Sequence, residues 1–134
     1  MDSLRYIAAL ESTTGVEVKD CIANEDTIMF VVKEGQLGKA IGKNGVNVKK
    51  LNAALGKRVQ LIEFSTDPVK FVSNMLSTIA QKTVTKTEDS GLTSIQIEVD
   101  FKSRGAVLGK GGKKVQILKD LLKRHHNISE VIIK

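Results

Sequence analysis

Ile41-Gly42-Lys43-Asn44-Gly45 is a short turn with two glycines three positions apart, and it recurs 67 residues later as Leu108-Gly109-Lys110-Gly111-Gly112. Glycine adopts backbone angles that other residues avoid and brings no side chain, so a Gly-x-x-Gly turn lets a bulky anion approach the main chain. When such a turn leads into a helix, the unpaired amide hydrogens and the dipole of that helix also favour negative charge. Each turn is therefore predicted to bind phosphate with its backbone.

The sequence around the two turns is duplicated as well. When the chain is shifted by 67 residues, apolar positions coincide without a gap over about 30 residues. The matched pairs are Ile28 with Ile95, Phe30 with Ile97, Val32 with Val99, Val48 with Val115, Leu51 with Leu118, and Leu55 with Leu122. We therefore predict two domains, 1–66 and 67–134. Domains of about 60 residues bury a marginal core, so the halves are expected to pack together in a fixed orientation.

Apolar periodicity predicts the same order of elements in each half: helix, strand, strand, short helix, glycine turn, helix, strand. Ser3 is a candidate N-cap of the first helix, with Leu4, Ile7 and Ala8 on its apolar face, and Asp67 is a candidate N-cap before Pro68. In the first half the predicted elements are 3–13, 16–22, 27–33, 36–41, 46–55 and 58–64. In the second half they are 68–79, 83–87, 93–99, 103–108, 113–124 and 128–133.

The net charge of +6 lies mainly in the second half, since residues 1–66 carry nine basic and eight acidic residues and residues 67–134 carry twelve and seven. A basic balance fits nucleic acid, an acidic protein or an anionic membrane. No apolar run approaches the roughly 20 residues of a membrane span, and no secretory signal opens the chain. We expect a cytoplasmic protein without a membrane partner, with the single Cys21 in its core.

Enzyme motifs fit the chain poorly. A nucleotide-hydrolase loop needs four residues between its glycines, whereas Gly38 and Gly42 enclose three. A dinucleotide fingerprint that starts with Gly109 and Gly111 would need its third glycine at the position of Lys114. His125 and His126 have no cysteine or paired carboxylate at ligand spacing and are read as helix-cap and surface residues. We predict no catalytic residues, no metal and no cofactor.

Each half resembles a KH domain, whose signature is a GxxG loop between two helices with an apolar residue, here Ile41 or Leu108, before it. The element order resembles the type II arrangement, and the close pairing of two units is similar to the KH pair of NusA-like transcription factors. The resemblance implies an α+β fold of two tandem type II KH domains, each a three-stranded sheet with helices packed on one face.

The resemblance also implies a function and a site: single-stranded RNA whose backbone lies along the GxxG loops and whose bases lie in an apolar groove. RNA polymerase or a transcription complex is the implied partner, and a monomer is expected. An assembly factor acting on ribosomal RNA remains the alternative. The residues implied for RNA binding are Gly42, Lys43, Asn44, Gly45, Gly109, Lys110, Gly111 and Gly112, supported by Lys39, Lys49, Arg104, Lys113 and Lys114.

Ile41, Val48, Leu108 and Val115 either floor the implied grooves or belong to the ordinary core. Aromatic residues make up only 4% of the chain and Trp is absent. RNA-binding folds that rely on stacking need exposed aromatic side chains. Recognition is therefore expected to depend on backbone contact and groove shape.

Overall fold

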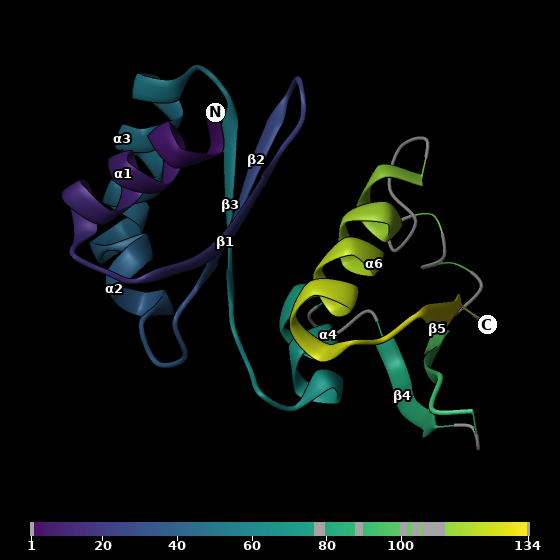
Figure 1. Cartoon of the computed structure of the whole chain (residues 1–134). Helices are drawn as coiled ribbons and strands as arrows, with labels where there is room; N and C mark the ends of the chain where they lie inside the picture. Colours follow the sequence, from purple (N-terminus) through teal and green to yellow (C-terminus); the bar gives the residue numbers. More distant parts are fainter. Residues whose placement is uncertain are drawn as a thin grey trace. The chain divides into compact units, whose positions relative to one another are not determined.

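The computed structural model describes residues 2–76, 80–87, 90–99, 102, 105 and 112–133. The chain divides into two compact units, Met1–Phe64 and Ser65–Lys134 (Figure 1). Among the described residues, no helix combines the length and the apolar character that crossing a membrane requires.

The first unit is a three-stranded sheet with helices on one face (Figure 1). The strand order is β1-β2-β3, with β1 antiparallel and β3 parallel to the central strand β2. Its elements are α1 (Asp2–Thr14), β1 (Val18–Ala23), β2 (Thr27–Val32), α2 (Leu37–Ile41), α3 (Val46–Leu55) and β3 (Arg58–Glu63), with a single 3₁₀ turn, Lys43–Gly45, between α2 and α3.

The core of this unit lies between β2 and the helices. Ile28, Phe30 and Val32 alternate along β2 and are fully buried in one cluster with Leu51 of α3 and Ala40 of α2. Because successive strand residues point to opposite faces, these three side chains share the helix-covered face. Burial of β-branched and aromatic side chains on a central strand fixes where α2 and α3 sit, and therefore where the turn between them sits.

Helix α1 differs from the sequence prediction in its start and in its buried face. The helix begins at Asp2, before Ser3, so Ser3 is not its N-cap. Tyr6 and Leu10 are its buried residues. Of the predicted face, Ile7 is half-buried against the core, whereas Leu4 is 70% exposed and Ala8 is exposed too. Tyr6 and Leu10 lie at i and i+4 on one face of the helix, and an aromatic side chain has a large apolar surface to bury, which favours this face.

Cys21 on β1 lies in the same core. Burial, reinforced by the Asp20 carboxylate and opposed by a hydrogen bond with the Ser3 side chain, raises the pKa of the Cys21 thiol to about 11. The thiol therefore stays protonated at neutral pH and behaves as a small apolar side chain.

The second unit has the same sheet topology as the first. The strand order is β4-β5-β6, with β4 antiparallel and β6 parallel to β5. Its elements are α4 (Pro68–Leu76), β4 (Ala80–Thr87), β5 (Thr93–Val99), α6 (Lys113–His126) and β6 (Glu130–Ile133). The short helix predicted over 103–108 lies, apart from Gly105, outside the described residues.

Helix α4 starts as its sequence predicts. The Val69 amide donates to Asp67 Oδ1 at 3.0 Å and the Phe71 amide donates to the Asp67 carbonyl at 2.9 Å, so Asp67 is the N-cap and Pro68 the first helical residue. Helix α6 runs to His126, two residues beyond the prediction. It ends because Asn127 takes left-handed backbone angles, with φ 53° and ψ 35°, a role that asparagine fills more readily than other non-glycine residues.

Candidate nucleic-acid interface

The first glycine turn is formed by backbone angles that few residues adopt. Gly42 has φ 78° and ψ 169°, and Asn44 and Gly45 are both left-handed, with φ 57° and 73°. The Gly42 amide donates to the Gly38 carbonyl at 3.0 Å, and the Gly45 amide donates to the Gly42 carbonyl at 3.1 Å. The turn therefore reverses the chain tightly between α2 and α3 and leaves Lys43 and Asn44 exposed at its tip.

Gly42 suits the positive φ at this position, and a side chain here would also displace two neighbouring side chains. A Cβ at this position would lie 2.7 Å from Nδ2 of Asn47 and 3.0 Å from Cγ1 of Val46. Gly45 has open space around it, so its glycine is explained by the left-handed backbone alone. The two glycines of this GxxG sequence thus serve different local needs.

The start of α3 has fewer free backbone donors than the sequence suggested. The Gly45 amide is bonded to Gly42, and the Val46 amide is bonded to the Lys43 carbonyl. These bonds continue the 3₁₀ turn directly into the helix. Because these bonds occupy two amides near the helix start, fewer backbone donors remain there, and Lys43 and Asn44 are the exposed side chains of the turn.

The cations near this turn differ in where they point. Lys39, Lys43 and Lys49 are all exposed. The Lys39 ammonium lies beside Gly15, since a Cβ built there would be 3.4 Å from Lys39 Nζ. Gly15 directly follows α1, and the negative end of a helix dipole favours a cation at this place. In this conformation Lys39 therefore serves the end of α1, and Lys43 is the cation in the turn itself.

The apolar residues beside the turn are partly accessible. Ile41 and Val48 are half-buried, and Val46 is 41% exposed. The buried core cluster of the first unit contains Leu51 of α3 but neither Ile41 nor Val48. These side chains therefore leave apolar surface available next to the turn, as the floor of a base-binding groove requires.

The second turn is only partly described. Arg104, Leu108, Gly109, Lys110 and Gly111 lie outside the described residues. Gly112 precedes α6 with φ 74° and ψ 11°, matching the φ 73° and ψ 20° of Gly45 before α3. At the start of α6, Lys113 is exposed and Lys114 half-buried, and Val115 is half-buried as well. The final glycine thus has the same backbone conformation and the same place before a helix in both units.

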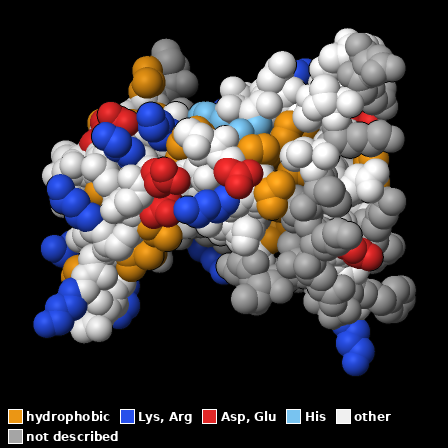
Figure 2. Space-filling view, turned by 90° about the horizontal axis from the view of Figure 1, so that it is seen from below, with side chains coloured by type: hydrophobic (Ala, Val, Ile, Leu, Met, Phe, Trp, Pro, Cys, Tyr) orange, Lys and Arg blue, Asp and Glu red, His pale blue; other side chains and the backbone are white. Residues whose placement is uncertain are grey.

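Neither stacking platforms nor a metal cluster appears among the described residues. Tyr6, Phe30 and Phe71 are buried, and Phe64 is half-buried with Lys19 Nζ 5.7 Å from its ring centroid. Within the described ranges no three His, Cys, Asp or Glu side chains gather as a metal site needs. Figure 2 shows Lys and Arg side chains standing singly or in small groups, with acidic side chains beside some of them.

The two histidines at the end of α6 are half-buried rather than surface residues. The rings of His125 and His126 lie 6.3 Å and 5.3 Å from the ring of Phe71, measured between centroids. Burial, together with the charge of His125, lowers the pKa of His126, against the opposing effects of a hydrogen bond with the Ser65 backbone and of the Asp67 carboxylate. The sequence pattern could not show this, because the partners come from the start of the same unit.

Comparison with known proteins identifies a family that matches this chain and relatives that are similar to it. The family profile described as "KH domain" matches residues 4–102. "Probable transcription termination protein NusA" of Methanocaldococcus jannaschii is 35% identical over 130 residues, covering 97% of this chain and 71% of that protein. The protein of the same name from Halobacterium salinarum is 33% identical, covering 97% and 93%.

A more distant relative of that name, from Thermoplasma acidophilum, is 28% identical over 133 residues, covering 99% of this chain and 92% of its own. Among solved structures, the crystal structure of APE1850 superposes with a TM-score of 0.78 at 33% sequence identity, covering 99% of this chain and 98% of that one. The similarity therefore extends over both units.

Proposed function

The chain belongs to the KH-domain family as a NusA-like member, and on this premise we propose that it is a non-enzymatic protein that binds single-stranded RNA in transcription termination or elongation. The proposal assigns one type II KH domain to residues 1–66 and one to residues 67–134. It is supported by the repeated sheet topology and by the matching conformations of Gly45 and Gly112. The name shared by the relatives supports the role in transcription.

The observation that carries the proposal is the geometry of the first turn. Its tip exposes Lys43 and Asn44 on a backbone that has no side chain at Gly42 or Gly45. A phosphodiester lying along this tip would meet the Lys43 ammonium, the Asn44 carboxamide and the local main chain. The half-buried Ile41 and Val48 would then contact bases. Neither Lys43 nor Asn44 acts as a nucleophile or a base here, so the turn binds RNA without catalysing a reaction.

The second turn supplies cations in the proposal. Helix α6 opens with Lys113 and Lys114 and has no acidic residue in its first turn. Cations at a helix N-terminus are disfavoured by about 0.3–1 kcal/mol each, so they weaken the helix unless an anion lies beside them. A phosphate held by Gly109, Lys110, Gly111 and Gly112 would offset that repulsion. With about four nucleotides per KH unit plus a junction, the two turns would hold about 8 to 12 nucleotides.

The proposal extends to the surroundings of the protein. We assign it to the cytoplasm as a monomer that meets RNA polymerase or a transcription complex through the bound transcript. The alternative, an assembly factor on ribosomal RNA, predicts preference for structured ribosomal RNA over free single strands.

Charge reversal at each turn tests the proposal. We expect the double variants Lys43→Asp/Asn44→Asp and Lys110→Asp/Gly111→Asp each to weaken binding to a single-stranded oligoribonucleotide at least about tenfold, or ~1.4 kcal/mol. The circular dichroism melt should change little, because aspartate tolerates left-handed angles. Lys123→Asp is the matched control, since its exposed side chain lies about 15 Å along α6 from Lys113.

Three outcomes separate the possibilities. Loss of affinity in both turn variants but not in the control supports RNA binding by the turns. Unchanged affinity in both turn variants contradicts it. Tighter binding of the unaltered chain to structured ribosomal RNA than to single strands favours the assembly factor.

A further inference from the structure

Helix α2, which carries the first glycine turn, is too short to hold itself in place. It has five residues, Leu37–Ile41, and Ala40 is its single buried one. Isolated helices shorter than about 12 residues are marginal in water even with favourable sequences. The buried Ala40 anchors α2 to the core, and the bonds at the two ends of so short a helix add to what fixes the position of the turn.

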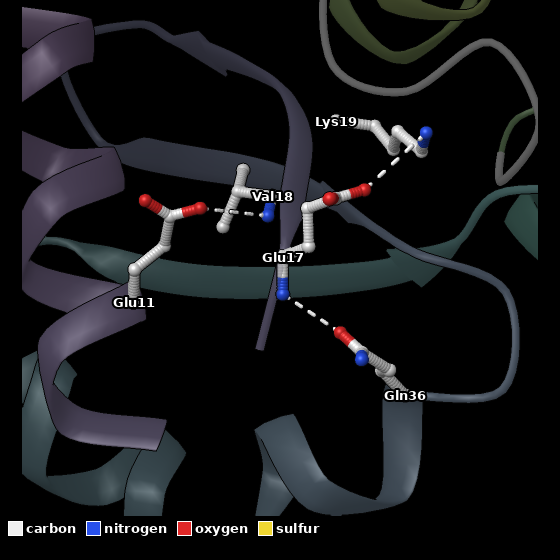
Figure 3. A network of polar contacts seen from close by, with 5 residues as sticks. All are labelled: Glu11, Glu17, Val18, Lys19 and Gln36. Atoms are coloured by element: carbon white, nitrogen blue, oxygen red, sulfur yellow. Dashed lines mark hydrogen bonds and ion pairs between the residues drawn. The ribbon is translucent and has the colours of Figure 1, made fainter. Parts of the chain in front are cut away.

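The start of α2 is attached by a carboxamide to Glu17, the residue before β1. Gln36 is the N-cap residue, and its Oε1 accepts a hydrogen bond from the Glu17 amide at 2.7 Å (Figure 3). The Glu17 carbonyl accepts from the Lys33 amide at 2.9 Å, so the segments before β1 and after β2 are joined at this point. The Val18 amide donates a further hydrogen bond to Oε2 of Glu11 of α1 at 3.1 Å.

The end of α2 is attached to α3 by a second carboxamide. Asn47 Nδ2 donates to the Lys39 carbonyl at 3.2 Å, across the glycine turn. The last carbonyls of a helix lack partners within the helix, so this bond satisfies one of them. The same amide group occupies the space that a side chain at Gly42 would need.

We propose that Asn47 and Gln36 are positioning residues for RNA binding. Their hydrogen bonds hold α2 at both ends and so fix the position of the first turn before RNA binds. The inference rests on the proposed function of the turn. Asn47 has the larger effect, because its bond spans the turn itself. The second unit has Lys114 at the position equivalent to Asn47, 67 residues later, so it places a cation where the first unit places this link.

Removal of the Asn47 side chain tests the inference. We expect Asn47→Ala to weaken RNA binding about 3- to 10-fold, as the loss of one positioning hydrogen bond does. The salt dependence of binding should stay unchanged because no cation is lost. Lys43→Gln, by contrast, should make the slope of log affinity against log salt concentration less steep by about 0.7. In the RNA-free protein, the NMR signals of the Gly42 and Gly45 amides should shift. Gln36→Ala should act in the same direction with a smaller effect.

Asn52→Ala is the matched control. Asn52 is also a carboxamide on α3, but its Oδ1 accepts from the Val59 amide at 2.8 Å, at the far end of the helix from the turn. This variant should lower the free energy of unfolding and leave RNA affinity and the two glycine signals unchanged.

The outcomes distinguish a positioning role from other roles. Weaker RNA binding in Asn47→Ala with unshifted Gly42 and Gly45 signals would mean direct contact with RNA and overturn the inference. Shifted signals with unchanged affinity would overturn it too, while leaving the proposed function intact. If the unaltered chain bound no single-stranded RNA, the proposed function itself would fail and the inference with it.

Discussion

At the scale of single residues, the first turn depends on left-handed backbone at two consecutive positions, Asn44 and Gly45. Asparagine is the non-glycine residue that takes these angles most readily, and it also brings a carboxamide. Gly111 stands at the position equivalent to Asn44. The additional glycine of the second turn therefore suits the same left-handed backbone.

Substitution of Asn44 separates backbone need from side-chain need. We expect Asn44→Gly to change the free energy of unfolding by less than about 0.5 kcal/mol, and Asn44→Val to lower it by about 1–2 kcal/mol, because a β-branched residue is strained at φ 57°. Urea denaturation measures both values. Equal stability of the two variants would contradict the left-handed assignment at this position.

The His126 side chain makes the stability of the second unit depend on pH. Its pKa is lowered in the folded state from the ordinary value of 6.5, mainly by burial, so the unfolded chain binds the proton more tightly. Neutral His126 makes its full contribution to the free energy of unfolding above about pH 6.5, and this contribution is lost as the pH falls below that value.

We therefore expect the urea concentration at the midpoint of denaturation to decrease when the pH is lowered from 7.5 to 5.5. His126→Gln should flatten this dependence, whereas His125→Gln, which keeps the ring of His126 against Phe71, should retain most of it. A profile for His126→Gln as steep as that of the unaltered chain would show that other groups cause the pH dependence.

The glycines of the turn could be predicted from sequence because their need is local, whereas Asn47 and Gln36 could not. Their bonds join residues 8 and 19 positions apart, so they exist only after α2, α3 and β1 have been placed. The usable signal was the duplication itself. Asn47 and Lys114 are unlike residues at equivalent positions, which marks a place where the two turns differ.

At the scale of elements, the strongest local signals gave the right bounds. The predictions 46–55 and 93–99 coincide with α3 and β5, and the N-cap at Asp67 is confirmed. The face of α1 was predicted wrongly at Leu4 and Ala8, which are exposed, and correctly at Ile7, which packs against the core; all three satisfy helical spacing. Periodicity alone does not show which of two apolar stripes meets the sheet, and the ring of Tyr6 decides it here.

The cap of α4 gives a prediction at this scale. Asp67→Ala removes the acceptor of the Val69 amide, and we expect it to lower the free energy of unfolding by about 0.5–2 kcal/mol. Thr66→Ala, at the exposed neighbouring position, is the control and should change it by less than about 0.5 kcal/mol. Thermal or urea denaturation measures the difference, and equal effects would mean that the cap contributes nothing.

At the scale of the whole molecule, two units of one topology carry different charge. Residues 1–66 have one net positive charge and residues 67–134 have five. The first turn has Lys43 at its tip, whereas the second has Lys110 in its sequence and Lys113 and Lys114 at the helix start. If both turns hold one strand, its phosphates meet cations mainly in the second unit.

The salt dependence of binding reports this division of charge. For single strands, the logarithm of affinity falls with a slope of roughly −0.7 per phosphate neutralised, so four to six contacts predict about −3 to −4 for the unaltered chain. The double variant Lys113→Gln/Lys114→Gln should reduce the magnitude of this slope by about 1.4, and Lys43→Gln should reduce it by about 0.7. Titrations of a labelled oligoribonucleotide between low and moderate salt measure these slopes. Equal reductions would mean that the lysines of α6 do not both meet phosphate, and a flat response of the unaltered chain would favour a protein partner over RNA.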